Sequence, residues 1–289
     1  LVDINTITGF GLFVFKCSYA HCVALQVNCC LFMTIRIYTS SQDLTDAAAD
    51  LALRLGQPLT DAHTLALQLE LLADDCAPGY RLCLSLTCAD APGPITCDFT
   101  TGRNAHRRRY GGGRGQSIAR AIGIRKNPLP TVIDTTAGLG RDAYVLATLG
   151  CEVTMLERSP VLAAMLENGL QRAIDQDPDD PVFQRLRLVN TEASDYLQQL
   201  KSSLYADVIY LDPMYPHRDK HALVKKEMQI LQQLLGSNDD APRILASALP
   251  VARQRVVVKR PVWAASLEGP APRHEITGKT TRFDIYPSR

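Results

Sequence analysis

The sequence predicts an α/β protein with one mostly parallel sheet and a small α+β lobe in front of it. Two observations carry this prediction. From residue 131 onward, short β-branched runs alternate with segments of helical periodicity, as in sheets whose parallel strands are joined by helices. Between the first such strand and helix, small residues with Gly138 and Gly140 form a tight loop that lets a ligand approach the backbone. Together they indicate a Rossmann-like sheet.

Length and composition place few limits on function. The 289 residues suffice for one or two domains, and 46% hydrophobic with 21% charged residues is ordinary for a soluble globular protein. Because the net charge is only +1, nucleic-acid binding would need a local basic patch. None of the nine cysteines forms a Cys-x-x-Cys pair, so we expect no metal site and reduced thiols in the cytoplasm.

The first 102 residues divide into a leader and a small lobe. Residues 1–32 are apolar, begin without Met and are interrupted by polar side chains, which favours a non-native leader over a signal peptide or membrane segment. Met33 is then the expected start. The lobe spans residues 33–102, with a strand over 34–38, a helix over 44–55 and further strands over 65–72, 81–88 and 95–99.

A basic, glycine-rich stretch opens the main domain, which we expect to span residues 103–289. Residues 103–126 hold eight basic side chains and no acidic one, with three consecutive glycines and Tyr110 among them. Arginine forks on a flexible backbone suit phosphate contacts, so we expect RNA binding here; a solvated loop is the alternative. The RNA-binding residues predicted in this stretch and in the basic helix beginning at 217 are Arg107, Arg108, Arg109, Arg114, Lys225 and Lys226.

The first strand of the main domain, 131–134, ends in an acid. Asp134 stands four residues before Gly138. A carboxylate at that place can accept hydrogen bonds from the ammonium of a methionine moiety or from its shell, whereas it would disfavour the pyrophosphate of NAD. The loop itself, residues 138–143, matches only the looser Gly-x-Gly-x-x-Ala form of the dinucleotide fingerprint. This strand end therefore favours S-adenosylmethionine, with NAD or a plain turn as alternatives.

The next two strands also lead into polar residues. The second, 152–157, ends in Glu157, where a carboxylate can take both ribose hydroxyls of an adenosine. A helix begins at Ser159 and runs to about residue 173. The third strand, 186–190, leads into Thr191, Glu192 and Ala193, which we expect along the adenine edge.

The fourth strand, 206–211, ends in the sequence Asp-Pro-Met-Tyr-Pro. Enzymes that methylate exocyclic amines carry an acid or amide, two prolines and an aromatic residue at this place. A base amino group is a poor nucleophile because its lone pair is delocalised into the ring. A carboxylate and a backbone carbonyl can accept its two N–H bonds while an aromatic ring stacks on the extruded base. We expect these roles for Asp212, the Pro213 carbonyl and Tyr215; an ordinary turn after a buried strand is the alternative.

The end of the chain completes the predicted sheet. A fifth strand is expected over 255–258, and the segments HEITG and TRFDIY read as a closing antiparallel pair. A mostly parallel sheet with such a hairpin at its edge is the class I S-adenosylmethionine-dependent methyltransferase arrangement.

Several sequence blocks resemble the bacterial ribosomal RNA small-subunit methyltransferase J family. They are HRRRYGGGRGQ, DTTAGLGRDAYVLA, LERSP, YLDPMYPH, ALVKKEM, VVVKRP and TRFDIY, in the same order over residues 33–289. The resemblance implies transfer of a methyl group from S-adenosylmethionine to N2 of one guanine in 16S ribosomal RNA. It implies 16S rRNA or the small ribosomal subunit as partner, and neither a membrane nor a metal.

The resemblance also implies which residues contact the cofactor. At the matching positions stand Arg141, Asp142, Glu157, Arg158, Glu192, Ala193 and Asp212. The family carries two serines where this chain has Glu192 and Ala193, so the Ala193 N–H or the neighbouring Ser194 would have to supply one polar contact.

Three other functions stay open at this point. An NAD-dependent oxidoreductase could share the sheet, but the chain has no Tyr-x-x-x-Lys pair and the Asp-Pro-Met-Tyr-Pro motif would have no role. A methyltransferase acting on adenine N6 or on a protein glutamine could use a similar motif, although the basic stretch favours RNA. A non-catalytic RNA-binding protein could keep the fold, but the retained acids Asp134, Glu157 and Asp212 argue against lost cofactor binding.

Overall fold

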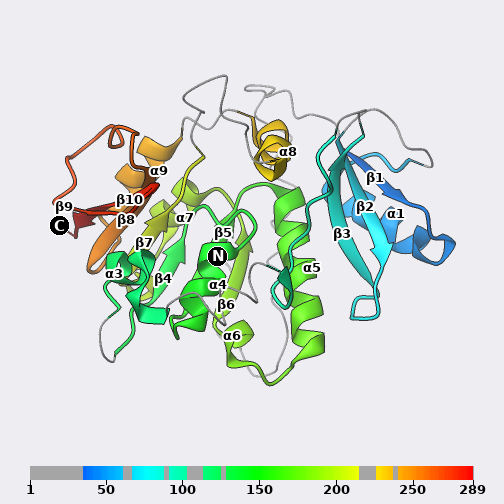
Figure 1. The fold of residues 1–289 in the computed structure, drawn as a ribbon, viewed down its shortest axis with the longest axis horizontal. Helices are drawn as coiled ribbons and strands as arrows, with labels where there is room; N and C mark the ends of the chain where they lie inside the picture. The colour runs from blue at the N-terminus through cyan, green and yellow to red at the C-terminus, as the bar shows by residue number, and fades with distance from the viewer. Residues whose placement is uncertain are drawn as a thin grey trace.

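Two sheets form the framework of the molecule. The computed structural model describes residues 35–60, 67–87, 91–102, 113–124, 128–214, 226–236 and 240–288. Within them the chain forms a 3-stranded and a 7-stranded sheet. The small sheet lies at the right of Figure 1 and the large sheet at the left, with helix α5 between them. The expected leader and Met33 lie outside the described residues.

The small sheet has the order β1-β2-β3, with β1 parallel to β2 and β2 antiparallel to β3. Its elements are β1 (Arg36–Thr39), η2 (Gln42–Leu44), α1 (Thr45–Leu55), β2 (Leu67–Ala73) and β3 (Tyr80–Leu86). The predicted strand over 95–99 is wrong, because only Ile95 forms a bridge, to Leu84. The Asp98 carboxylate accepts the backbone N–H groups of Thr100 and Thr101, which turns the chain away from the sheet.

The large sheet confirms the predicted class I arrangement. Its order is β6-β5-β4-β7-β8-β10-β9. Neighbouring strands are parallel from β6 to β8, while β10 runs antiparallel to both β8 and β9. The strands are β4 (Val132–Asp134), β5 (Val153–Glu157), β6 (Leu186–Asn190), β7 (Val208–Leu211), β8 (Arg255–Pro261), β9 (His274–Thr277) and β10 (Thr281–Pro287).

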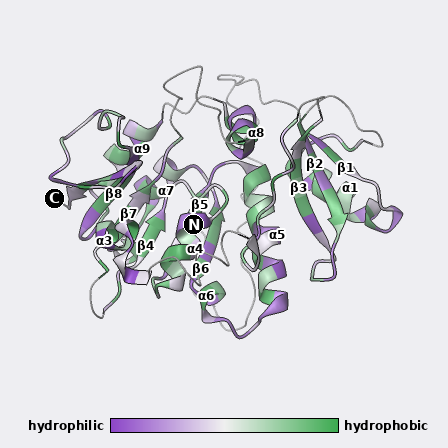
Figure 2. Cartoon of the chain, viewed as in Figure 1, coloured by the Kyte–Doolittle hydropathy of each residue, from purple (hydrophilic) through white to green (hydrophobic). Residues whose placement is uncertain are grey.

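Helices cover both faces of the large sheet, and β7 shows why. All four residues of β7 are buried, as expected for a strand with helices on both faces of its sheet. Their side chains point alternately into two hydrophobic clusters, one on each face of the sheet. Val208 and Tyr210 join the cluster that holds α3, α4 and α5, whereas Ile209 and Leu211 join the cluster that holds α7 and α9. The central strands are accordingly mostly green in Figure 2. The helices are η3 (Gly113–Gly115), α3 (Ser117–Ile122), α4 (Arg141–Thr148), α5 (Pro160–Gln176), α6 (Pro181–Gln184), α7 (Ala193–Gln199), η4 (Ser202–Leu204), α8 (Lys226–Leu235) and α9 (Ala241–Ala248).

Helix α5 joins the small lobe to the large sheet. The Asn168 side chain accepts the Leu82 N–H at 3.0 Å and donates to the Tyr80 carbonyl at 2.8 Å, which satisfies part of β3. One turn further on, the buried Arg172 guanidinium pairs with Asp74 at 3.4 Å and donates to the carbonyl of Cys97 at 3.2 Å. One hydrophobic cluster runs through both parts, so they share a core.

The described residues contain neither a membrane-spanning helix nor a metal-binding group. No helix among them is both long and apolar enough to cross a bilayer. No group of three or more His, Cys, Asp or Glu side chains in that part of the chain is arranged to hold a metal ion.

Candidate active site

The carboxyl ends of the parallel strands bring polar side chains to one edge of the large sheet. β4 lies between β5 and β7, so the direction of the connections reverses at β4 and a crevice is expected at its end. Asp134 ends β4 and Glu157 ends β5. Asp212 and Lys259 directly follow the last residue pair of β7 and β8. The sheet register therefore gathers three acids and one lysine.

The loop between β4 and α4 leaves room for a ligand. The Ala137 N–H donates to the Leu156 carbonyl at 3.1 Å, and the Gly138 N–H donates to Glu157 Oε2 at 2.9 Å, so the loop is fixed to β5. A Cβ at Gly138 would meet only the Thr136 carbonyl oxygen, at 3.9 Å. The space above Gly138 is open, and its backbone is bonded to the buried Glu157 carboxylate. Such a place suits a ligand that carries hydroxyl groups, like the ribose that the sequence predicts at Glu157.

The two loop glycines allow a matched stability test. At Gly140, φ is +69° and an added Cβ would lie 2.8 Å from Leu166 Cδ2 and 3.0 Å from Phe99 Cζ. We expect Gly140→Ala to lower the free energy of unfolding by about 2–4 kcal/mol, from left-handed strain plus overpacking. Gly138→Ala has similar strain but open space, so we expect about 1–2 kcal/mol. Urea denaturation measures both, and equal losses would contradict the described packing.

Glu157 and Asp134 are buried acids with different surroundings. Glu157 accepts the Ser159 N–H at 2.8 Å and the Gly138 N–H at 2.9 Å. Burial raises its pKa to about 7, although both N–H groups oppose the shift. Asp134 accepts the Thr136 N–H at 3.1 Å, and burial raises its pKa to about 8. A cationic ligand group beside Asp134 would favour its charged form.

A lysine bridges two acids beside them. Lys259 Nζ donates to Asp212 Oδ2 at 2.6 Å and to Asp142 Oδ2 at 2.7 Å. Partial burial disfavours the ammonium, but the carboxylates of Asp212 and Asp142 outweigh burial and hold the pKa of Lys259 above its usual range. Tyr210 Oη also donates to Asp142 Oδ2, at 2.7 Å, and burial keeps the pKa of Tyr210 well above its ordinary value. The Asp142 carboxylate is thus held by two donors.

Asp212 is fixed at both its backbone and its side chain. Its N–H donates to Thr136 Oγ1 at 2.6 Å, which ties the end of β7 to the loop after β4. Oδ2 is taken by Lys259. The side chain is 36% exposed, and within the described residues Oδ1 has no hydrogen-bond partner. Asp212 therefore presents one carboxylate oxygen in a defined orientation.

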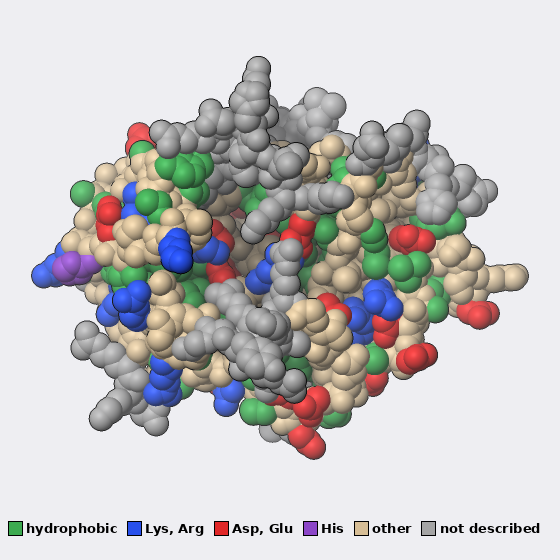
Figure 3. Space-filling view, viewed as in Figure 1, with side chains coloured by type: hydrophobic (Ala, Val, Ile, Leu, Met, Phe, Trp, Pro, Cys, Tyr) green, Lys and Arg blue, Asp and Glu red, His purple; other side chains and the backbone are tan. Residues whose placement is uncertain are grey.

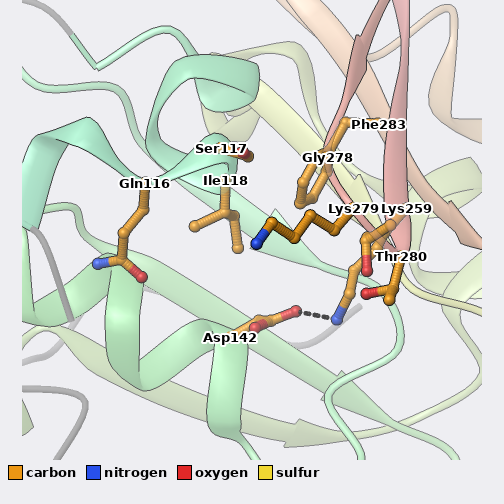
Figure 4. Close-up of a pocket in the computed structure, with 10 residues that line it drawn as sticks. Gln116, Ser117, Ile118, Asp142, Lys259, Gly278, Lys279, Thr280 and Phe283 are labelled. Atoms are coloured by element: carbon orange, nitrogen blue, oxygen red, sulfur yellow. Dashed lines mark hydrogen bonds and ion pairs between the residues drawn. The ribbon is translucent and has the colours of Figure 1, made fainter.

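A cavity of about 420 Å³ lies next to this cluster, on the side away from β5. It opens between α3 and the turn that joins β9 to β10, with Asp142 and Lys259 at its base (Figure 4). Lys279 extends from the turn toward the same space in Figure 4. The lining residues are Gln116, Ser117, Ile118, Asp142, Lys259, Gly278, Lys279, Thr280, Thr281 and Phe283.

The other residues predicted to contact the cofactor are engaged with neighbouring helices. Arg141 makes a bidentate pair with Glu227 of α8, with Nη1 2.9 Å from Oε2. Arg158 donates to Asp240, the residue before α9, at 3.0 Å, and its Nη1 lies 3.9 Å from Glu192 Oε1. These ion pairs connect the segments that follow β4 and β5 to α8 and to the start of α9.

Ala193 and Ser194 begin α7, directly after Glu192 at the helix N-cap. Both are buried, and Ser194 Oγ lies 3.4 Å from the Asp195 carboxylate. That contact is local, so the structure does not favour Ser194 as a replacement for the family's second serine.

Some predicted residues lie outside the described ranges. Tyr215, Arg107, Arg108, Arg109 and Lys225 are outside them, and Lys226 begins α8 with a side chain that is not described. Pro213 is buried after β7, and Arg114 is exposed in η3. Residues 117–122, inside the predicted RNA-binding stretch, form helix α3, which packs four buried residues in the core and leaves Arg120 exposed.

Sequence reasoning missed Lys259, Thr136 and Tyr210. Thr136 stands two residues after Asp134, and Tyr210 stands two residues before Asp212. Lys259 directly follows three valines, one residue past the strand expected over 255–258, although β8 itself extends to Pro261. Only the order of the strands, with β8 beside β7, turns that position into a contact with Asp212.

The fold and this edge define a class I S-adenosylmethionine-dependent methyltransferase. In agreement, residues 54–288 match the family of SAM-dependent methyltransferases. A solved SAM-dependent methyltransferase from Neisseria gonorrhoeae aligns with a TM-score of 0.65 and 32% identity, covering 88% of this chain and 95% of that one.

Curated relatives narrow the class to a family. The ribosomal RNA small subunit methyltransferase J of Thioalkalivibrio sulfidiphilus is 50% identical over 252 residues, which cover 87% of this chain and 97% of that protein. The protein of the same name from Pseudomonas aeruginosa is 47% identical, covering 88% of this chain and 95% of its own length. The chain belongs to the ribosomal RNA small subunit methyltransferase J family.

Proposed function

We propose that this protein transfers a methyl group from S-adenosylmethionine to the exocyclic N2 of a guanine in 16S ribosomal RNA, in the cytoplasm. The observation that carries the proposal is the placement of Asp212. Its backbone is tied to Thr136 in the loop after β4, and its carboxylate is bound by Lys259, which lines the cavity beside β8. An acceptor between a cofactor loop and a base-sized cavity suits amine methylation.

The cofactor is assigned to the β4 and β5 side of Asp212. Glu157 would accept the ribose hydroxyls, Asp134 would face the ammonium or its hydration shell, and the loop at Gly138 leaves the necessary space. When bound there, S-adenosylmethionine supplies an electrophilic methyl group on a sulfonium that is already a good leaving group. No metal is required for such a transfer.

The target amine is assigned to Asp212. Its Oδ1 would accept one N2–H bond and the Pro213 carbonyl the other, which directs the nitrogen lone pair along the line of attack. As the N–C bond forms, the proton that leaves N2 passes to Asp212. The Lys259 ammonium holds Oδ2 at 2.6 Å, which fixes the carboxylate plane. We assign base stacking to Tyr215, as the sequence predicts.

RNA binding is assigned to basic residues around this edge. Arg114 is exposed in η3, which directly precedes α3 and the cavity. Arg107, Arg108 and Arg109 stand a few residues earlier in the chain. Lys226 begins α8, and Lys225 precedes it in the sequence. These side chains would contact RNA phosphates without reading sequence.

The cofactor assignment is tested by isothermal titration of the full chain with S-adenosylhomocysteine and, separately, with NAD. We expect the homocysteine product to bind with a Kd in the micromolar range, about −7 to −8 kcal/mol, and NAD not to bind. Binding of NAD alone would contradict the proposal.

Cofactor affinity should depend on pH through Glu157. Because burial raises its pKa to about 7, the carboxyl is mostly protonated at pH 6 and mostly ionised at pH 8. The ionised form accepts more hydrogen bonds, so we expect S-adenosylhomocysteine to bind several-fold more tightly at pH 8 than at pH 6. Titration calorimetry of the parent and of Glu157→Gln measures this. A variant that keeps the same pH dependence would show that another group controls it.

A further inference from the structure

The single tryptophan of the chain lies exposed at the rim of the candidate site. Trp263 follows β8, four residues after Lys259, and its relative exposure is 46%. Its neighbour Val262 is 36% exposed. Large apolar side chains are normally buried, so two adjacent exposed ones mark a place where a partner can bind.

The turn that carries Trp263 is fixed to the wall of the cavity. The Ala264 N–H donates to the Pro261 carbonyl at 3.0 Å, which closes the turn. The Val262 N–H donates to the carbonyl of Thr280 at 3.2 Å, and Thr280 lines the cavity. Trp263 is therefore held beside the cavity by backbone hydrogen bonds.

The surroundings of this turn are basic. Lys and Arg side chains gather at the left of Figure 3, over β8, β9, β10 and α3. Exposed members from these elements and their connections are Arg114, Arg120, Arg273 and Lys279. Two exposed acids lie on the same segments, Glu268 in the connection after β8 and Glu275 in β9. Glu275 lies 3.8 Å from Arg282, so its charge is partly offset, and the four exposed basic residues outnumber the two acids. An aromatic ring among cations suits a single-stranded nucleic acid better than an apolar protein surface.

We propose that Trp263 stacks on the base next to the target guanine, so that the 261–264 turn extends the RNA-binding surface past the cavity. The inference rests on the proposed function, because it takes RNA as the substrate. It adds a stacking contact on the far side of the cavity from the cofactor loop. A base has an aromatic face whatever its identity, so this contact would add affinity with little sequence preference.

Tryptophan fluorescence tests the contact directly, because emission from this chain reports on one residue. The full chain is titrated with a short single-stranded RNA, and separately with inorganic polyphosphate of equal charge. We expect RNA to quench the emission with the same midpoint as the anisotropy of labelled RNA, and polyphosphate to leave it nearly unchanged. Unchanged emission at saturating RNA would overturn the proposal.

Three variants separate stacking from general effects. Trp263→Ala should raise the Kd for RNA about tenfold to a hundredfold, the effect of losing one stacked base. Trp263→Phe keeps an aromatic face and should stay within about threefold. Leu204→Ala is the matched control, because Leu204 is 60% exposed in η4, before the amino end of β7. We expect it to leave RNA affinity unchanged.

The outcomes are distinguishable from a failure of the proposed function. S-adenosylhomocysteine affinity should be unchanged in all three variants, which shows that the site is folded. A Kd for Trp263→Ala within twofold of the parent would refute stacking whether or not methyl transfer occurs. RNA binding is measured without turnover, so it tests the stacking contact independently of catalysis. An absence of guanine methylation would contradict the proposed function, but it would not decide whether Trp263 stacks on RNA.

Discussion

Asp212→Asn is expected to lower the rate of methyl transfer by about 10²–10⁴-fold, the range typical of a lost general base. Asparagine keeps the shape and can still accept one hydrogen bond, but it can no longer take the N2 proton. Lys259 would keep its second partner, Asp142, at 2.7 Å, so the fold should be preserved. Single-turnover methylation measures the rate, and thermal unfolding measures the fold.

The matched control for this variant is Asp195→Asn. Asp195 is exposed in the first turn of α7, and the same chemical change there removes only a 3.4 Å contact with Ser194. We expect its turnover to equal that of the parent. An Asp212→Asn enzyme that turns over within tenfold of the parent would show that Asp212 is not the proton acceptor.

Lys259→Met is expected to affect stability as well as activity. It would leave Asp142 and Asp212 close together without the shared ammonium. Removing one partner from a buried ion pair costs about 3–5 kcal/mol, and we expect about 2–4 kcal/mol because the Lys259 side chain is 27% exposed. Lys279→Met, at the exposed turn of the same cavity, should change stability by less than about 0.5 kcal/mol.

The stability loss of Lys259→Met should depend on pH in a defined direction. Without the ammonium, mutual repulsion raises the pKa of the two carboxyls above their values in the unfolded chain. The deficit is then fully present at high pH and shrinks as the pH falls and a carboxyl takes up a proton. Urea denaturation at pH 8 and pH 5 measures it. A deficit independent of pH, or equal to that of Lys279→Met, would contradict the ion-pair assignment.

Local sequence patterns predicted most of the large sheet. The strands β4, β5 and β7 are short, largely buried runs, and an acid ends or directly follows each of them. Asp134, Glu157 and Asp212 could therefore be placed at strand ends without knowing the strand order. Because carboxyl ends of parallel strands share one edge, the acids were expected together. Their hydrogen-bond partners could not be predicted in the same way, since Lys259 meets Asp212 only through the pairing of β7 with β8.

One error and one omission also have physical causes. The strand expected over 95–99 has a suitable composition, but the Asp98 side chain bonds the following backbone N–H groups and ends the extended segment. In the basic stretch, the density of arginines hid the helical spacing of Ile118 and Ile122, which are both buried in α3. The sequence around Trp263 has no pattern that indicates a binding role. Its exposure and its position beside the cavity are known only from the structure.

Identification of the methylated nucleoside tests the proposed guanine-N2 methylation. Small subunits and free 16S rRNA from cells that lack this methylation are incubated with the protein and S-adenosylmethionine carrying an isotopically labelled methyl group. The RNA is then digested and analysed by mass spectrometry. We expect label in N2-methylguanosine, at one site, and labelling slower by about 10²–10⁴-fold with Asp212→Asn. Label in N6-methyladenosine, or in ribosomal protein alone, would contradict it.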